Sequence, residues 1–151
     1  MKKLRFKGSP LKTELGNFAA PENGVPFIYL LTDTDSKEPF YIGEYGKAST
    51  YNVITRIQRH FARSGTLARV ALNMPRFGHQ LPSEFDAYIK ELSDEFKDHK
   101  KRADLEAWVI HLVCHQKKIQ SSKFCVTKYV SPENNYSQEA QKIVDEFGKY
   151  S

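Results

Sequence analysis

The segment P-F-I-Y-L-L-T-D-T-D-S-K-E-P-F-Y-I-G-E-Y, residues 26–45, decides the fold. Two short apolar runs flank a stretch of turn-forming residues, which predicts a β-hairpin with strands at about 25–32 and 39–43. Tyr29 lies in the first strand and Tyr41 in the second. Because side chains alternate between the two faces of a strand, a hairpin of this length can bring both phenol groups to one face.

The stretch after the hairpin predicts a helix at about residues 50–63. Arg56 and His60 lie four positions apart, so a helix would place a guanidinium and an imidazole on the same side. Ser64 and Gly65 end this helix, with the glycine where a left-handed cap is common. A cation and a titratable ring would therefore follow the two tyrosines directly.

The second half of the chain predicts further helices and strands. Residues 84–92, E-F-D-A-Y-I-K-E-L, fit a helix and a strand equally well by periodicity. A helix at about 94–118, bent near 98–101, carries apolar residues at helical spacing with Glu106 at their margin. Residues 124–130 indicate a short strand, and a C-terminal helix runs through Phe147.

These residues, taken in order, resemble the GIY-YIG nuclease family. The second half of the family motif is intact as Tyr41-Ile42-Gly43, whereas the first half reads Phe27-Ile28-Tyr29, with Phe in place of Gly. The resemblance covers residues 24–118. It implies an α+β fold with a small three-stranded antiparallel sheet flanked by helices, and it favours a strand at 84–92.

The resemblance also implies a catalytic set, namely Tyr29, Tyr41, Arg56, His60 and Glu106. Glu106 would hold one Mg²⁺ (or Mn²⁺), because a lone carboxylate with several waters suits that ion. Tyr29 is the first candidate for the base, and Tyr41 would orient the water or the phosphate. Arg56 would clamp the phosphate and favour a phenolate, and His60 would act as an auxiliary acid.

The loop between Tyr41 and Arg56 is longer than is usual for the family, so Arg59 is an alternative to Arg56. The family's closing Asn has two candidates, Asn134 and Asn135. Both assignments stay open at the level of sequence.

The charge distribution favours a polyanionic substrate. The formal net charge is +5 and the isoelectric point about 9.1. Basic residues gather in a stretch that has few acids, and the expected DNA contacts are Lys47, Arg59, Arg63, Arg69 and Arg76. The first interpretation is therefore a metal-dependent DNA endonuclease, and the alternative is a catalytically inactive nucleic-acid-binding module on the same fold.

Length and cysteine content set the remaining expectations. The 151 residues fit one domain at 24–151, preceded by an N-terminal arm at 1–23 that has basic residues and little periodicity. No apolar run approaches the roughly 18 residues of a membrane span. The first ten residues lack the apolar core of a secretory leader, so we expect a cytoplasmic protein. Because that compartment is reducing, Cys114 and Cys125 are expected to be free thiols.

One rival cluster has the residue types of a zinc site: His111, Cys114, His115 and Cys125. The histidines share a helical face, but Cys114 points away from that face, and the spacing to Cys125 matches no ordinary zinc finger. A zinc-stabilised interaction protein is therefore the third and weakest interpretation.

Overall fold

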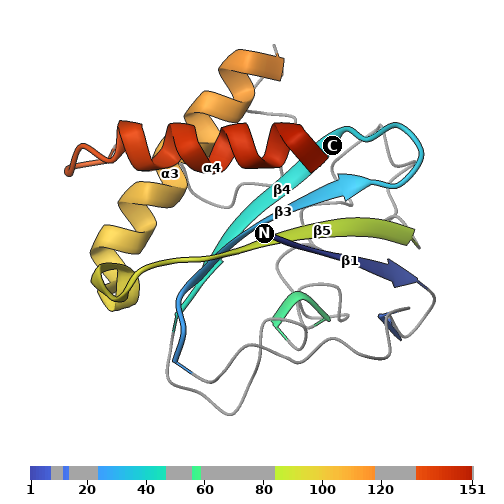
Figure 1. Cartoon of the computed structure of the whole chain (residues 1–151), viewed down its shortest axis with the longest axis horizontal. Coiled ribbons are helices and arrows are strands. Elements are labelled where there is room, and N and C mark those ends of the chain that lie inside the picture. Colours follow the sequence, from blue (N-terminus) through green and yellow to red (C-terminus); the bar gives the residue numbers. More distant parts are fainter. Residues whose placement is uncertain (8–11, 14–23, 47–55, 59–83, 118–131, 151) are drawn as a thin grey trace, which may run out of the picture.

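The computed structural model describes residues 1–7, 12–13, 24–46, 56–58, 84–117 and 132–150, and Figure 1 shows their arrangement. The chain has an α+β fold with a five-stranded antiparallel sheet in the order β2-β1-β5-β3-β4. Its strands are β1 (Lys2–Lys7), β2 (Lys12–Thr13), β3 (Phe27–Asp33), β4 (Pro39–Tyr45) and β5 (Glu84–Glu91). The helical elements are η2 (Asp94–Lys97), α3 (His99–Lys117) and α4 (Ser137–Tyr150).

The predicted hairpin is confirmed as β3 and β4. Its turn is closed by the Asp33 carboxylate, which accepts hydrogen bonds from the backbone N–H groups of Asp35 (2.9 Å) and Ser36 (2.8 Å). Strand β3 places Tyr29 opposite Gly43 and Leu31 opposite Tyr41. The two tyrosines therefore point to the same face, as the period of two requires.

The expected N-terminal arm is wrong for residues 2–7, which form β1 and pair with β5 along their whole length. Leu4 and Phe6 have no exposed surface, because the alternation K-L-R-F-K turns every second side chain toward the core. Together with the two-residue β2, this strand enlarges the expected three-stranded sheet to five strands.

The ambiguous segment at 84–92 is a strand, as predicted. Strand β5 lies between β1 and β3, so both of its edges are hydrogen-bonded, and a hydrophobic core covers each of its faces. Phe85, Ala87 and Ile89 pack on one face, and Tyr88 packs on the other. A central strand explains why both faces carry large apolar side chains.

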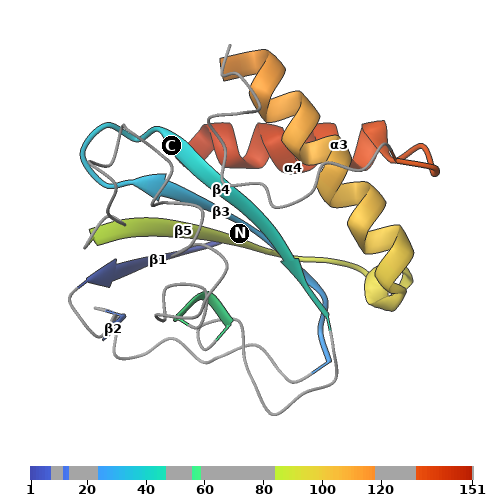
Figure 2. The same ribbon diagram turned by 180° about the vertical axis from the view of Figure 1, so that it is seen from behind.

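The sheet separates helices α3 and α4 from the helical residues 56–58 (Figures 1 and 2), and a hydrophobic core lies on each of its faces. Helices α3 and α4 cover one face, where Ile28, Leu30 and Ile42 meet residues such as Val109 and Phe147. The other face carries Tyr29, Tyr41 and, from the helical residues 56–58, Ile57. The helical residues 56–58, which include Arg56, thus lie on the tyrosine face, and the rest of the helix predicted at 50–63 lies outside the described residues.

The helix predicted at 94–118 is instead two elements, because the 3-10 helix η2 ends at Lys97, Asp98 has extended backbone, and α3 begins at His99; the break lies in the region where a bend was expected. Asp98 stops the first element and accepts a hydrogen bond from the Lys101 N–H (2.9 Å). The predicted C-terminal helix is confirmed as α4, whose apolar face holds Ile143 and Phe147. Within the described segments, no helix combines the length and apolarity that crossing a membrane requires. The strand predicted at 124–130 lies outside the described residues.

Candidate active site

Tyr29 and Tyr41 form the centre of the candidate site. Their ring centroids lie 5.9 Å apart with the planes tilted by 40°. Tyr29 has no exposed surface, whereas Tyr41 is 8% exposed. Both tyrosines belong to the core, and Tyr41 keeps a small exposed surface that Tyr29 lacks.

Gly43 makes this packing possible. A Cβ atom at this position would overlap the hydroxyl end of the Tyr29 ring and would lie 2.7 Å from Cε1 of Tyr41. No larger residue fits there without displacing a buried ring. The glycine of the Y-I-G triplet thus has a steric role, which is to leave room for the phenol opposite it.

The two hydroxyls share a hydrogen bond, and its effects on the two groups have opposite sign. Burial is the largest cause that raises the pKa of Tyr29 well above its usual range, and the hydrogen bond to Tyr41 raises it further. Burial also raises the pKa of Tyr41, followed by the charge of Glu106, but the hydrogen bond from Tyr29 lowers it. Tyr29 is therefore the donor and Tyr41 the acceptor, and this hydrogen bond favours the ionised form of Tyr41.

Arg56 reaches this tyrosine pair. Ile57 anchors the helical residues 56–58 with no exposed surface, and the Arg56 guanidinium lies 5.8 Å from the centre of the Tyr45 ring. Its positive charge lowers the pKa of Tyr29 and of Tyr41. The Arg56 Nε atom is buried and has no hydrogen-bond partner within the described part of the chain. A buried guanidinium nitrogen without a partner is suited to an anionic ligand.

Glu106 approaches the pair from α3, which packs against β4 at the edge of the sheet. The residue is partly exposed, but protein surrounds its carboxyl group. Burial raises the pKa of Glu106 to about 8, with a further increase from the Glu44 charge, while Arg102 and Arg56 lower it. Without a further cation, this carboxyl is largely protonated near neutral pH.

Arg102 and Glu44 lie within electrostatic range of Glu106 and act on its pKa in opposite directions, and sequence reasoning missed both. Arg102 is buried and donates to the Glu44 carboxylate and to the backbone carbonyls of Phe96 (3.0 Å) and Lys97 (3.1 Å). A Cβ at Gly46 would lie 2.7 Å from Cζ of Arg102, so that glycine leaves room for the guanidinium. The available signal was the spacing of Arg102 and Glu106, four apart on one helix.

The structure brings Tyr29, Tyr41, Arg56 and Glu106 into mutual electrostatic range. The burial of Tyr29 argues against its expected role as the base, because that side chain has no exposed surface to meet a water. The other predicted site residues lie outside the described segments: Lys47, Arg59, His60, Arg63, Arg69 and Arg76.

The two Asn candidates have structural partners. The Asn134 side-chain amide donates to the Asp104 carboxylate (2.7 Å), and the Asn134 backbone carbonyl accepts from the Trp108 indole (2.9 Å). Asn134 therefore links the start of the last described segment to α3. The Asn135 carboxamide oxygen accepts from the Ser137 N–H (3.2 Å), which places it at the start of α4.

The described residues do not support the zinc alternative. Among them, no three His, Cys, Asp or Glu side chains gather as metal ligands. The His111 ring packs edge-on against Trp108, with centroids 6.2 Å apart, and Cys114 is a half-buried free thiol on the helical core. Cys125 lies outside the described segments.

A divalent cation fits the chemistry of Glu106. Mg²⁺ is commonly bound through one or two carboxylates, with waters and substrate oxygens completing its shell. Glu106 supplies one buried carboxyl group, and the nearby positive charge is not enough to ionise it fully near neutral pH. A bound cation would supply that charge and would stabilise negative charge on a phosphoryl group.

Comparisons of the chain with protein-family models, with curated proteins and with solved structures give no significant match. The class of protein is therefore defined by its own fold and site. It is an α+β protein in which a tyrosine pair, an arginine and a glutamate converge at the edge strand of an antiparallel sheet.

Proposed function

We propose that the chain is a divalent-metal-dependent endonuclease of the GIY-YIG type that hydrolyses phosphodiester bonds of DNA. The observation that carries the proposal is the convergence of four side chains from separate segments, namely Tyr29, Tyr41, Arg56 and Glu106. Polar side chains that only cover the exposed surfaces of strands and helices would not be expected to converge in this way. The net charge of +5 agrees with a polyanionic substrate.

Each member of the set has a chemical task. The buried Nε of Arg56 donates to a phosphoryl oxygen, which orients the scissile phosphate and stabilises the charge that develops on it. Glu106 would hold the cation. Tyr41, the acceptor of the pair and the less buried of the two, contacts the attacking water and takes its proton, while Tyr29 donates to Tyr41 and fixes its hydroxyl.

The proton transfer requires a lower pKa for Tyr41 than burial gives it. Two interactions already act in this direction, the hydrogen bond from Tyr29 and the charge of Arg56, whereas the charge of Glu106 opposes them. Any positive charge that compensates Glu106 therefore favours the Tyr41 phenolate as well. The charge on Glu106 is thus coupled to the ionisation of Tyr41.

The test is incubation of the purified protein with supercoiled plasmid in Mg²⁺ and, separately, in EDTA. The proposal predicts nicked and linear products in Mg²⁺ and neither product in EDTA. Binding is followed in parallel by a gel-shift assay with Ca²⁺ in place of Mg²⁺.

A second candidate, a nucleic-acid-binding module without catalysis, rests on Phe27. This residue stands where the family motif has Gly, is only 2% exposed and belongs to the core of the tyrosine face. Plasmid binding without any cleavage would favour this candidate. Neither binding nor cleavage would overturn both functions.

A further inference from the structure

A separate cavity of about 220 Å³ lies between the β3–β4 hairpin and the two long helices. Its walls are mainly apolar, from Leu30, Pro39, Val113, Val144 and Phe147. Leu30 belongs to the core under α3 and α4, whereas Tyr29 and Tyr41 belong to the core on the other face. The cavity is therefore distinct from the candidate active site.

The cavity contains one buried hydroxyl that lacks a partner. Thr32 lines the cavity and is 1% exposed, and its Oγ1 atom has no hydrogen bond within the described part of the chain. Thr32 follows the irregularity in the β3–β4 register, on the same face as Leu30. Buried hydroxyls usually find a partner, so a ligand acceptor in the cavity would complete this one.

The cavity also has a cation at its rim. Lys37 lines it from the hairpin turn, where its backbone has a positive φ of 61°, an uncommon conformation for a lysine. The Asp33 carbonyl oxygen accepts the Lys37 N–H (3.0 Å) and holds the turn in this form. Uncommon backbone conformations persist where the surroundings fix them, often at ligand sites.

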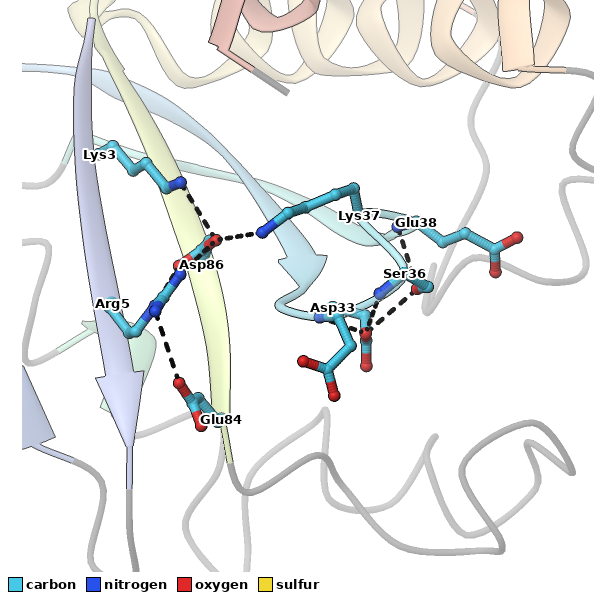
Figure 3. A network of polar contacts seen from close by, with 9 residues as sticks. Lys3, Arg5, Asp33, Ser36, Lys37, Glu38, Glu84 and Asp86 are labelled. Carbon is cyan, nitrogen blue, oxygen red and sulfur yellow. Dashed lines mark hydrogen bonds and ion pairs between the residues drawn. The ribbon is translucent and has the colours of Figure 1, made fainter.

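Lys37 is not the principal partner of the nearest carboxylate (Figure 3). Its Nζ lies 3.6 Å from Asp86, which has no exposed side-chain surface. Arg5 (2.9 Å) and Lys3 (3.3 Å) lie closer to that carboxylate and neutralise it. Lys37 can therefore share its charge with an incoming anion while Asp86 stays paired.

We propose that this cavity binds a small organic monocarboxylate with an apolar body. The Thr32 hydroxyl and the Lys37 ammonium donate to the carboxylate, and the apolar walls enclose the body. One hydroxyl and one ammonium suit a single negative charge. The volume exceeds the roughly 150 Å³ that holds benzene and is below the roughly 300 Å³ of drug-sized sites, which fits a single ring or a short chain.

The probe is sodium phenylacetate, titrated into the full chain and followed by ¹H–¹³C methyl NMR. Phenylacetamide, which has the same body without the charge, is the matched ligand control. The proposal predicts intermolecular nuclear Overhauser effects from the phenyl ring to the Val113 and Val144 methyl groups. It also predicts that phenylacetamide binds about tenfold more weakly, as the loss of one charge-assisted hydrogen bond implies.

Two variants test the polar contacts. Thr32→Val keeps the shape and removes the hydroxyl, and Lys37→Met keeps the stem and removes the charge. Each should weaken phenylacetate binding about fivefold to tenfold. The matched control is Thr34→Val, because Thr34 also has a buried hydroxyl without a partner in the described residues but does not line the cavity.

Three results would overturn the proposal. The first is no binding of phenylacetate at about 10 mM, a concentration that allows for the weak affinities of small ligands. The others are equal affinity for phenylacetate and phenylacetamide, and equal weakening of phenylacetate binding by Thr32→Val and Thr34→Val. None of these results depends on nuclease activity. The proposal is thus tested independently of the function assigned to the tyrosine face.

Discussion

Replacement of Gly43 by Ala tests whether the tyrosine pair depends on the absence of a side chain at this position. The added Cβ would overlap the buried end of the Tyr29 ring and approach Cε1 of Tyr41 to 2.7 Å. Tyr29 has no exposed surface, so its ring has no free path away from the methyl group. Overpacking of this kind costs about 1–3 kcal/mol.

Alanine also has less conformational freedom than glycine in the unfolded chain, which stabilises the folded protein by about 0.5–1 kcal/mol. The difference between the mid-values of these two ranges is a net loss of about 1.3 kcal/mol in the free energy of unfolding. With a urea dependence of about 2 kcal/mol/M, the midpoint of unfolding falls by about 0.5–1 M. The assay is urea unfolding followed by circular dichroism.

The matched control is Gly148→Ala in α4, where an added Cβ meets no atom within 4 Å. That variant should be as stable as the parent or more stable by up to about 1 kcal/mol, since Ala favours a helix over Gly. If Gly43→Ala is as stable as the parent, the explanation of the Y-I-G glycine is refuted.

Three further predictions concern the charged residues. Burial and the Glu44 charge raise the pKa of Glu106 from 4.5 to about 8. The stability that this carboxyl contributes is therefore fully present below pH 4.5 and is lost as the pH rises through about 8. The urea midpoints at pH 5 and pH 9 should differ less in Glu106→Gln than in the parent protein. Arg102→Met leaves the Glu44 carboxylate without its main partner and should cost about 3 kcal/mol in urea unfolding. Arg56→Ala should reduce both the nicking rate and the DNA affinity, whereas Arg59→Ala should reduce affinity alone, as measured by nicking and gel-shift assays.

A specific result would contradict each of these three predictions. An unchanged pH dependence in Glu106→Gln would show that another group titrates in that range. Lys101→Met is the control for Arg102→Met, and an equal loss in both would show that the ion pair adds nothing. If the Arg56 and Arg59 variants exchange their phenotypes, the functional arginine lies three positions further along the helix.

The hairpin and its tyrosine pair could be predicted because they depend on short-range rules. A turn sequence between apolar runs determines the pairing, and the period of two decides that Tyr29 and Tyr41 share a face. The same rules did not reveal β1, because its alternation spans only Leu4 and Phe6 among basic residues and becomes meaningful only beside β5.

The position of Glu106 relative to the tyrosines could not be calculated from the sequence. It depends on how α3 packs against β4, which is a long-range contact, and on the Arg102–Glu44 ion pair that links these two elements. The degree of burial of Tyr29 was also hidden, since periodicity gives the face of a side chain but not its depth. Because of that depth, the proposed function gives the role of the base to Tyr41 and not to Tyr29.

The proposal that Glu106 acts with the tyrosine pair and Arg56 in cutting DNA is tested by the single-turnover rate of plasmid nicking in Mg²⁺ by Glu106→Gln. The control is Glu139→Gln, which changes an exposed glutamate on α4. The account predicts that Glu106→Gln folds and binds DNA but loses at least about a hundredfold in rate, because the amide cannot hold a hard cation. Glu139→Gln should match the parent. Parental nicking rates in both variants would contradict the account.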